Sequence, residues 1–97
     1  MKIDTADIDY IEGMKNYAAL VCRNKKITSL VNLKDLEEKL SADKFIRVHK
    51  SFIISIQQIV SIEGNTIRLK DHPQANIPIG ESYKALFLEK LKTRLIS

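Results

Sequence analysis

A chain of 97 residues with 44% hydrophobic residues is long enough to form one small folded domain, and we expect residues 1–97 to form a single one. The single cysteine excludes a scaffold held by disulfides within the chain, and no apolar run approaches the roughly 20 residues of a membrane-spanning helix. The formal net charge of +4 is too small to identify a partner by itself. We therefore expect a cytoplasmic domain that does not contact a membrane.

Charge is unevenly distributed along this chain. Residues 1–12 contain four acidic residues and one lysine, whereas residues 13–34 contain five basic residues and no acid. Residues 44–62 also lack any acidic residue, so the cations of this stretch have no local carboxylate partner. The first segment should repel a polyanion, and the middle of the chain should attract one.

The first quarter of the chain predicts short strands separated by turns. Ile3 and residues 8–12, in which apolar and acidic side chains are mixed, indicate strand pieces, and the polar run after them indicates a turn that exposes Lys15 and Asn16. Residues 17–22 are continuously apolar, which favours a strand covered on both faces, with Cys22 as a small buried hydrophobe.

A hairpin and a short helix are predicted next. Lys25 and Lys26 lie at the tip of the hairpin that leads into residues 27–30. The helix begins after Asn32, whose side chain can accept a hydrogen bond from a free amide of the first turn, and it ends near residue 40. Val31 and Leu36 occupy the positions of a hydrophobic staple, so we expect this helix to cover a sheet.

Residues 45–48 predict the central strand of the domain. Alternation places Ile46 and Val48 on one face and a mixed set of side chains on the other. The strand leads into a corner that presents positive charge to a ligand. The corner residues are Arg47, His49, Lys50 and Ser51. The pattern of residues 51–58 leaves a helical turn and a bent strand as open alternatives.

The last third of the chain predicts a hairpin, an edge strand and a C-terminal helix. Alternating residues on either side of a tight turn at Gly64 and Asn65 indicate the hairpin, and His72 is expected to be a solvated turn residue. Pro78 cannot donate a ladder hydrogen bond and so marks an edge strand. Spacings of four predict an amphipathic helix over residues 82–96, which could pack on its own sheet or pair with a second copy. Its apolar stripe contains Tyr83, Phe87, Leu91 and Leu95, with Leu88 alongside. The overall expectation is a mainly β domain.

An enzyme hypothesis depends on His49 and Ser51, a base and a nucleophile close in sequence. No strained glycine turn surrounds Ser51, and the chain has only three glycines and no glycine-rich anion loop. The two histidines have no cysteine or carboxylate cluster at metal-ligand spacing. We therefore expect no catalytic site, no metal site and no cofactor.

Nucleic-acid binding explains the charge pattern better. Three loops, at Lys15 and Asn16, at Lys25 and Lys26, and at the corner, combine cations for phosphate with polar groups that can contact base edges. Only Tyr17 among the aromatic residues adjoins such a loop, and this favours duplex DNA over a single strand that needs stacking platforms.

Several motifs together resemble one known family. They are Tyr10-Ile11-Glu12 with Asn16-Tyr17, Asn32-Leu33 with Leu36 and Leu40, the run from Phe45 through Arg47-Val48-His49-Lys50-Ser51 to Ile53, and Ile77-Pro78-Ile79 with Tyr83-Lys84. On these residues, which span nearly the whole chain, it resembles the LytTR DNA-binding domain, the C-terminal output module of many bacterial response regulators.

The resemblance implies an elongated sandwich of short antiparallel strands with one internal and one C-terminal helix. It also implies loops inserted into successive major grooves of promoter repeats, a homodimer on DNA, and an N-terminal receiver domain absent from this excised module. The DNA-binding residues it implies are those of residues 15–18, the corner, and the turn before the last helix. In that turn the chain has Gly80, Glu81 and Ser82 where many members have Ser followed by Arg residues, so Lys84 could take over the contact.

We assign roles to the DNA-binding set as hypotheses. Lys50 is the best candidate to contact a base or clamp a phosphate, and Asn16 could pair with adenine. His49 is expected to hold the corner by hydrogen bonds, whereas Arg47 could brace the corner or contact DNA directly. Lysine clamps on the backbone are expected at Lys15, Lys25 and Lys26, with idle solvated charges as the alternative for the hairpin-tip pair Lys25 and Lys26. The DNA-binding set contains Lys15, Asn16, Tyr17, Arg47, His49, Lys50, Ser51 and Lys84.

The alternative is a protein-interaction module that uses the C-terminal helix stripe and the edge strand near Pro78. The DNA hypothesis requires that Lys50 is exposed and lies on the same side of the molecule as Lys15.

Overall fold

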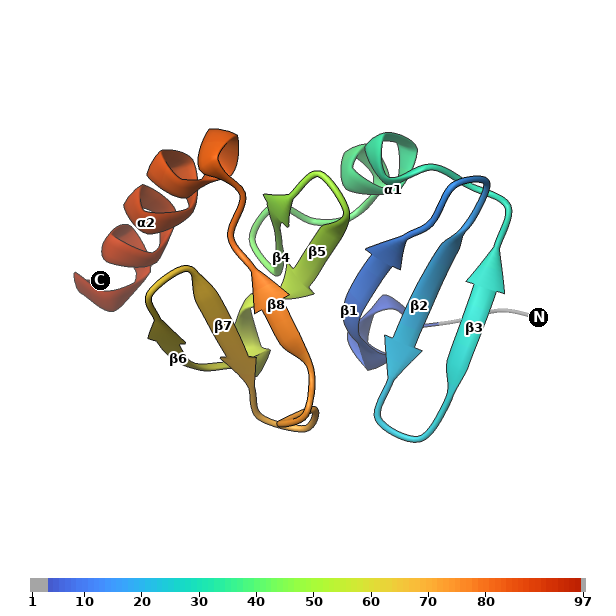
Figure 1. Cartoon of the computed structure of the whole chain (residues 1–97), viewed down its shortest axis with the longest axis horizontal. Coiled ribbons are helices and arrows are strands. Elements are labelled where there is room, and N and C mark those ends of the chain that lie inside the picture. Colours follow the sequence, from blue (N-terminus) through green and yellow to red (C-terminus); the bar gives the residue numbers. More distant parts are fainter. Residues whose placement is uncertain (1–3, 97) are drawn as a thin grey trace.

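The computed structural model describes residues 4–96, with side chains up to Lys92, so Ile3 and the side chain of Leu95 lie outside the described part (Figure 1). Eight strands form two antiparallel sheets, and the molecule is elongated, with extents of 38 × 25 × 25 Å. The predicted mainly β fold with an internal and a C-terminal helix is confirmed. The elements are η1 (Thr5–Asp7), β1 (Ile8–Gly13), β2 (Ala18–Cys22), β3 (Lys26–Ser29), α1 (Leu33–Lys39), β4 (Phe45–His49), β5 (Phe52–Ser55), η2 (Ile56–Gln58), β6 (Ile59–Glu63), β7 (Thr66–Leu69), β8 (Asn76–Pro78) and α2 (Glu81–Ile96).

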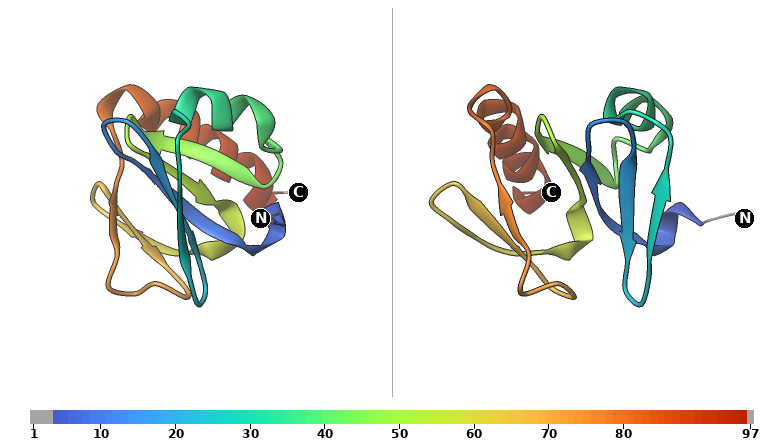
Figure 2. Two further views of the ribbon diagram at one scale, coloured as in Figure 1. Left: turned by 90° about the vertical axis from the view of Figure 1, so that its right-hand side faces the viewer. Right: turned by 45° about the vertical axis from the view of Figure 1, so that its right-hand side comes forward.

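The first sheet has five strands in the order β3-β2-β1-β5-β4, and the second has three in the order β6-β7-β8. Figure 2 shows the two sheets as adjacent layers, with α1 beside the five-stranded sheet and α2 beside β4. β8 is an edge strand of the second sheet, which confirms the expectation drawn from Pro78. None of the helices in the described part is long and apolar enough to span a membrane.

Strand β4 contributes to two hydrophobic clusters because its side chains alternate between the two faces of the sheet. Phe45 belongs to a cluster that α1 covers through Leu33 and Leu36, and Ile46 and Val48 belong to the cluster that includes α2 and the second sheet. The buried core thus joins both sheets and both helices.

The helices begin and pack as their sequences predict. The side chain of Asn32 accepts a hydrogen bond from the backbone N–H of Asp35 at 2.9 Å, and Val31 packs near Leu36 on the first cluster. Phe87 and Leu91 of α2 face the second cluster, with Phe87 fully buried. The apolar stripe of α2 therefore packs on its own domain, and this leaves less of it for the alternative protein-interaction function.

Residues 51–58 combine both open alternatives, because β5 is a strand that continues into the 3-10 turn η2. The turn at Gly64 is confirmed, and Gly64 has a φ of 63°, a conformation that residues with side chains rarely adopt. Cys22 is 5% exposed, and burial raises the pKa of its thiol, so it is the small buried hydrophobe that was expected.

The prediction for His72 is wrong. His72 is only 6% exposed, and its Nε2 lies 2.8 Å from Oδ2 of Asp9 on β1. Its ring also contacts Tyr10 edge-on, with 5.3 Å between the ring centroids. The turn after β7 folds back onto the first sheet, and a residue that looks solvated in the local sequence becomes part of the contact between the sheets.

Candidate nucleic-acid interface

One end of the domain gathers the turns that carry most of the predicted DNA-binding residues, at the top of Figure 1. The β1–β2 turn closes when the N–H of Met14 donates to the carbonyl of Tyr17 at 2.7 Å. The N–H of Gly13 donates to the carbonyl of Ser51 at 2.7 Å, and this hydrogen bond ties the β1–β2 turn to the β4–β5 turn. Two loops that are 35 residues apart in sequence thus lie side by side.

These two turns and the start of α1 line a basic depression of about 460 Å³. Four cationic side chains line it, and its described lining contains no acidic residue. Lys15 and Lys50 are exposed, and their side-chain amino groups form no ion pair or hydrogen bond among the described residues. The requirement that Lys50 is exposed beside Lys15 is therefore met. The cations of the basic depression are Lys15, Lys34, Arg47 and Lys50, and Tyr17 and Ser51 also line it.

The side chain of Arg47 stabilises the β4–β5 turn through hydrogen bonds to its backbone. Its Nε donates to the carbonyl of His49 at 3.1 Å, and one terminal nitrogen donates to the carbonyl of Lys50 at 2.7 Å. The other terminal nitrogen donates to a carboxylate oxygen of Glu37 on α1 at 3.0 Å, and the guanidinium lies 5.6 Å from the ring centroid of Tyr83 on α2. A single side chain, 15% exposed, therefore connects the turn to both helices.

His49 holds the same turn, as predicted. Its Nδ1 accepts a hydrogen bond from the backbone N–H of Ser51 at 3.0 Å, and its ring packs edge-on against Phe52 at 5.7 Å between centroids. The ring therefore bonds to the backbone of Ser51, and no contact with the Ser51 hydroxyl supports the base and nucleophile pair of the enzyme hypothesis. No group of three or more metal-ligating side chains is present among the described residues.

The turn before α2 lies against the β4–β5 turn. The N–H of Gly80 donates to the carbonyl of Val48 at 2.7 Å, and a Cβ at Gly80 would lie 3.4 Å from Cα of His49. Lys84, one turn further along α2, is exposed, and its Nζ donates to Oδ1 of Asn65 in the β6–β7 turn at 2.9 Å. The side-chain nitrogen of Lys84 thus bonds to the second sheet, whereas α2 itself packs beside β4 of the first.

Lys25 and Lys26 do not share this surface. They lie at the β2–β3 turn, and strand β2 separates that turn from the β1–β2 turn that carries Lys15. Figure 1 shows the β2–β3 turn at the bottom of the molecule, with the β1–β2 and β4–β5 turns at the top. Lys25 and Lys26 therefore cannot act as backbone clamps on the same surface as Lys15, and their position favours the alternative of solvated charges.

Lys34 was not predicted as a site residue. It lies in the first turn of α1 and lines the basic depression. The absence of acidic residues in residues 13–34 could have indicated that Lys34 belongs to a basic surface. The helix periodicity alone, however, places Lys34 on the solvent-exposed face of an amphipathic helix.

Comparisons with known proteins agree with this geometry. A family model described as the LytTr DNA-binding domain matches residues 1–92. The chain is 31% identical over 93 residues to the heme-containing CO-sensing transcriptional regulator RcoM 1 of Paraburkholderia xenovorans, covering 92% of this chain and 35% of that protein. It is 36% identical over 69 residues to the sensory transduction protein LytT of Enterococcus faecalis, covering 68% of this chain and 28% of that protein.

A solved LytTr DNA-binding domain from Bacillus cereus has the same fold, with a TM-score of 0.81 and 25% sequence identity over 94% of this chain and 86% of that chain. The chain spans only about a third of the length of the curated relatives it matches, between 28% and 35%. These matches support DNA binding in transcription regulation and not catalysis. The chain belongs to the LytTR DNA-binding domain family.

Proposed function

We propose that this domain binds double-stranded DNA sequence-specifically by inserting loops into successive major grooves, as the output domain of a two-component transcriptional regulator. The observation that carries the proposal is the basic depression, where Lys15 and Lys50 lie beside Lys34 without an acidic side chain in the described lining. Cations without an internal partner are available to replace counterions on DNA phosphates.

The two turns can play different parts in recognition. A major groove about 12 Å wide admits a narrow projecting turn, and lysine can reach the acceptors of guanine there. We assign base contact to Lys50, whose turn is fixed by Arg47 and His49, because a base reader needs a rigid support. Asn16 in the neighbouring turn is exposed and can pair with adenine.

The remaining contacts are assigned to the phosphate backbone. Lys15 and Lys34 flank the depression, and the hydroxyl of Ser51 and the ring of Tyr17 complete its rim. Lys84 lies on α2, outside the depression, and would contact a phosphate beside the second of the two successive major grooves. Glu81, which would repel phosphate, is not assigned a contact.

The proposal includes partners outside this domain. The relatives named LytT are sensory transduction proteins more than three times as long as the matched region, which leaves room for a receiver domain preceding the DNA-binding domain. We also propose that two copies occupy adjacent promoter repeats, so that the affinity for a repeated site exceeds the affinity for one repeat.

The test is a titration of labelled duplex DNA at several salt concentrations, with a site selected from a random duplex library. Replacing Lys15, Lys50 and Lys84 by Ala should weaken binding and reduce the slope of log K against log salt by about 0.9 for each phosphate contact. The matched control replaces Lys25 and Lys26 by Ala, which removes charge from the opposite end and should leave the slope nearly unchanged. Unchanged binding in the triple variant would refute the proposed surface.

The role of Lys50 can be separated from charge alone. If Lys50 contacts a base, its replacement by Ala should cost about 1 to 3 kcal/mol on the selected site and much less on random duplex DNA. An equal loss on both duplexes would assign Lys50 to a phosphate.

A further inference from the structure

The end of the domain opposite the basic depression holds two polar contacts between the sheets, which we call the polar clasp. In the first, Nε2 of His72 lies 2.8 Å from Oδ2 of Asp9, with both side chains nearly buried. In the second, Arg23 at the end of β2 donates to Oδ1 of Asp71 at 3.1 Å. Asp9 and Arg23 belong to the first sheet, and Asp71 and His72 follow β7 of the second.

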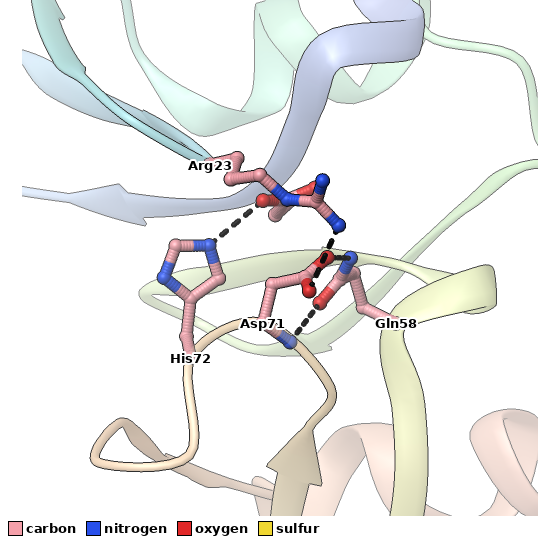
Figure 3. Close-up of polar contacts among 5 residues, drawn as sticks. Arg23, Gln58, Asp71 and His72 are labelled. Atoms are coloured by element: carbon pink, nitrogen blue, oxygen red, sulfur yellow. Dashed lines mark hydrogen bonds and ion pairs between the residues drawn. The ribbon is translucent and has the colours of Figure 1, made fainter.

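Asp71 is itself held in place by Gln58 of η2, as Figure 3 shows. The side-chain amide nitrogen of Gln58 donates to Oδ2 of Asp71 at 2.8 Å, and its oxygen accepts from the backbone N–H of Asp71 at 3.0 Å. Gln58 is 5% exposed, so its two hydrogen bonds with Asp71 are largely shielded from solvent. Arg23 therefore binds a carboxylate whose orientation is already set.

The clasp supplies the directional contacts at this end of the sheets. Between the sheets lies the second hydrophobic cluster, in which Ile54 of the first sheet packs with Ile67 and Leu69 of the second. Apolar contact is non-directional and resists separation of two sheets more than their rotation. At the other end the sheets are joined by the hydrogen bond from Gly80 to Val48. The polar clasp and this hydrogen bond lie at opposite ends of the sheets, and together they fix the angle between the two sheets, which either contact alone would leave free.

That angle determines where Lys84 lies relative to Lys15. Lys84 lies on α2, which packs beside β4 of the first sheet, but its Nζ is bonded to Asn65 in the β6–β7 turn, so the position of this amino group depends on the second sheet. Lys15 lies in the turn after β1 and moves with the first. Asp9 is separated from Gly13 by about 13 Å of strand, so a small rotation at the clasp displaces the loops at the far end.

We infer that Asp9, Arg23, Asp71 and His72 are positioning residues for DNA binding, which set the second sheet so that Lys84 contacts the same duplex as the turns of the first sheet. This inference rests on the proposed function. None of the four residues lines the basic depression. They act on DNA only through the angle between the sheets.

The experiment measures how far the Lys84 contact depends on the clasp. The clasp variant combines Arg23→Gln with Asp9→Leu and His72→Phe, because replacing both buried partners by apolar groups leaves no unpaired charge. Arg23→Gln alone, at a side chain 69% exposed, provides a second variant that should fold if the triple change does not. Lys25→Gln removes the same charge two residues away and is the matched control.

Each protein is made with and without Lys84→Ala, and with and without Lys15→Ala, and the salt slope is measured on the selected duplex. In the parent and the Lys25→Gln protein, Lys84→Ala should reduce the slope by about 0.9. In the clasp variant, Lys84→Ala should reduce the salt slope by less than half of that value, and in Arg23→Gln by an intermediate amount. The reduction in salt slope from Lys15→Ala should be the same in every background. A lower folded fraction would shift log K by the same amount at each salt concentration and would leave both lysine effects on the slope unchanged.

A full Lys84 effect in both the clasp variant and Arg23→Gln would overturn the inference while leaving the DNA surface intact. Absence of any Lys84 effect in the parent protein would overturn the inference together with the proposed Lys84 contact. Absence of both lysine effects in the parent would refute the proposed surface itself.

Discussion

Replacing Arg47 by Gln tests whether the most connected side chain of the interface supports the recognition turn or contacts DNA. The guanidinium donates to the carbonyls of His49 and Lys50 and to the carboxylate of Glu37. A glutamine amide is shorter and can replace at most one of these bonds. The β4–β5 turn should therefore lose its fixed geometry while Lys50 keeps its charge.

The magnitude follows from the contacts. A hydrogen bond from a charged donor to a part-buried carbonyl contributes about 1.5 to 3 kcal/mol, and one such bond is lost without replacement. The Glu37 pair adds less than about 1 kcal/mol, because Glu37 is half exposed and its charge is screened by solvent. We therefore expect Arg47→Gln to lower the free energy of unfolding by about 2 to 4 kcal/mol.

Two measurements on the same proteins decide the question. Urea denaturation gives the free energy of unfolding, and the salt dependence of binding to the selected duplex counts phosphate contacts. Arg47→Gln should destabilise the fold and weaken binding to the selected site, with a change in salt slope below half of one contact. Lys50→Ala should weaken binding but leave stability almost unchanged. The free energy of unfolding should change by less than about 0.5 kcal/mol, because Lys50 is an exposed surface residue.

Glu37→Gln is the control for the ion pair, since it leaves both carbonyl bonds of Arg47 in place and should cost less than about 1 kcal/mol. If Arg47→Gln instead reduced the salt slope by about 0.9 with unchanged stability, the guanidinium would be a phosphate contact and the bracing argument would be wrong.

Three further predictions concern the scaffold. Hydrogen bonds from Gln58, and to a smaller extent from Arg23, lower the pKa of the Asp71 carboxyl. The stability that this carboxylate contributes is therefore fully present above the ordinary pKa of 3.8 and is lost as the pH falls through the lower pKa of the folded state. The difference in melting temperature between the parent and Asp71→Asn should shrink on acidification, and a constant difference would contradict this. Gly64→Ala should cost about 1 to 2 kcal/mol from backbone strain alone, because φ is 63° and no atom lies near the added Cβ, while Gly64→Asn should cost less in the same melting experiment. Asn32→Ala should cost about 1 kcal/mol by removing the cap of α1, and Asn32→Asp should restore stability.

Local patterns predicted the elements of this fold well because each depends on a few neighbouring residues. The cap at Asn32, the glycine turn at Gly64 and the edge strand at Pro78 are examples. The corner at Lys50 was also predicted, since a strand that ends in cations and a hydroxyl presents them together. The support for that corner was only partly predicted: bracing by Arg47 was one of two alternatives, and its contact with α2 depends on tertiary packing.

The errors arose where position depends on topology. His72 is buried because it meets Asp9, 63 residues away, and no local signal marks such a pair. Lys25 and Lys26 were grouped with Lys15 by charge, although the turns at the two ends of one five-residue strand lie about 17 Å apart. That separation could have been inferred from the predicted strand alone, so this error was avoidable.

The basic depression leaves lysines without acidic partners, and this argues for function at that end. Near the clasp, Arg23 pairs with Asp71 at 3.1 Å. In the basic depression, Arg47 has an acidic partner, but Lys15 and Lys50 have none in the described part of the chain. Like charges left together without partners repel each other and weaken the fold slightly. The lysines of the depression therefore have a cost that binding to a polyanion would offset, and salt that screens them should raise the stability of the free domain while it weakens DNA binding.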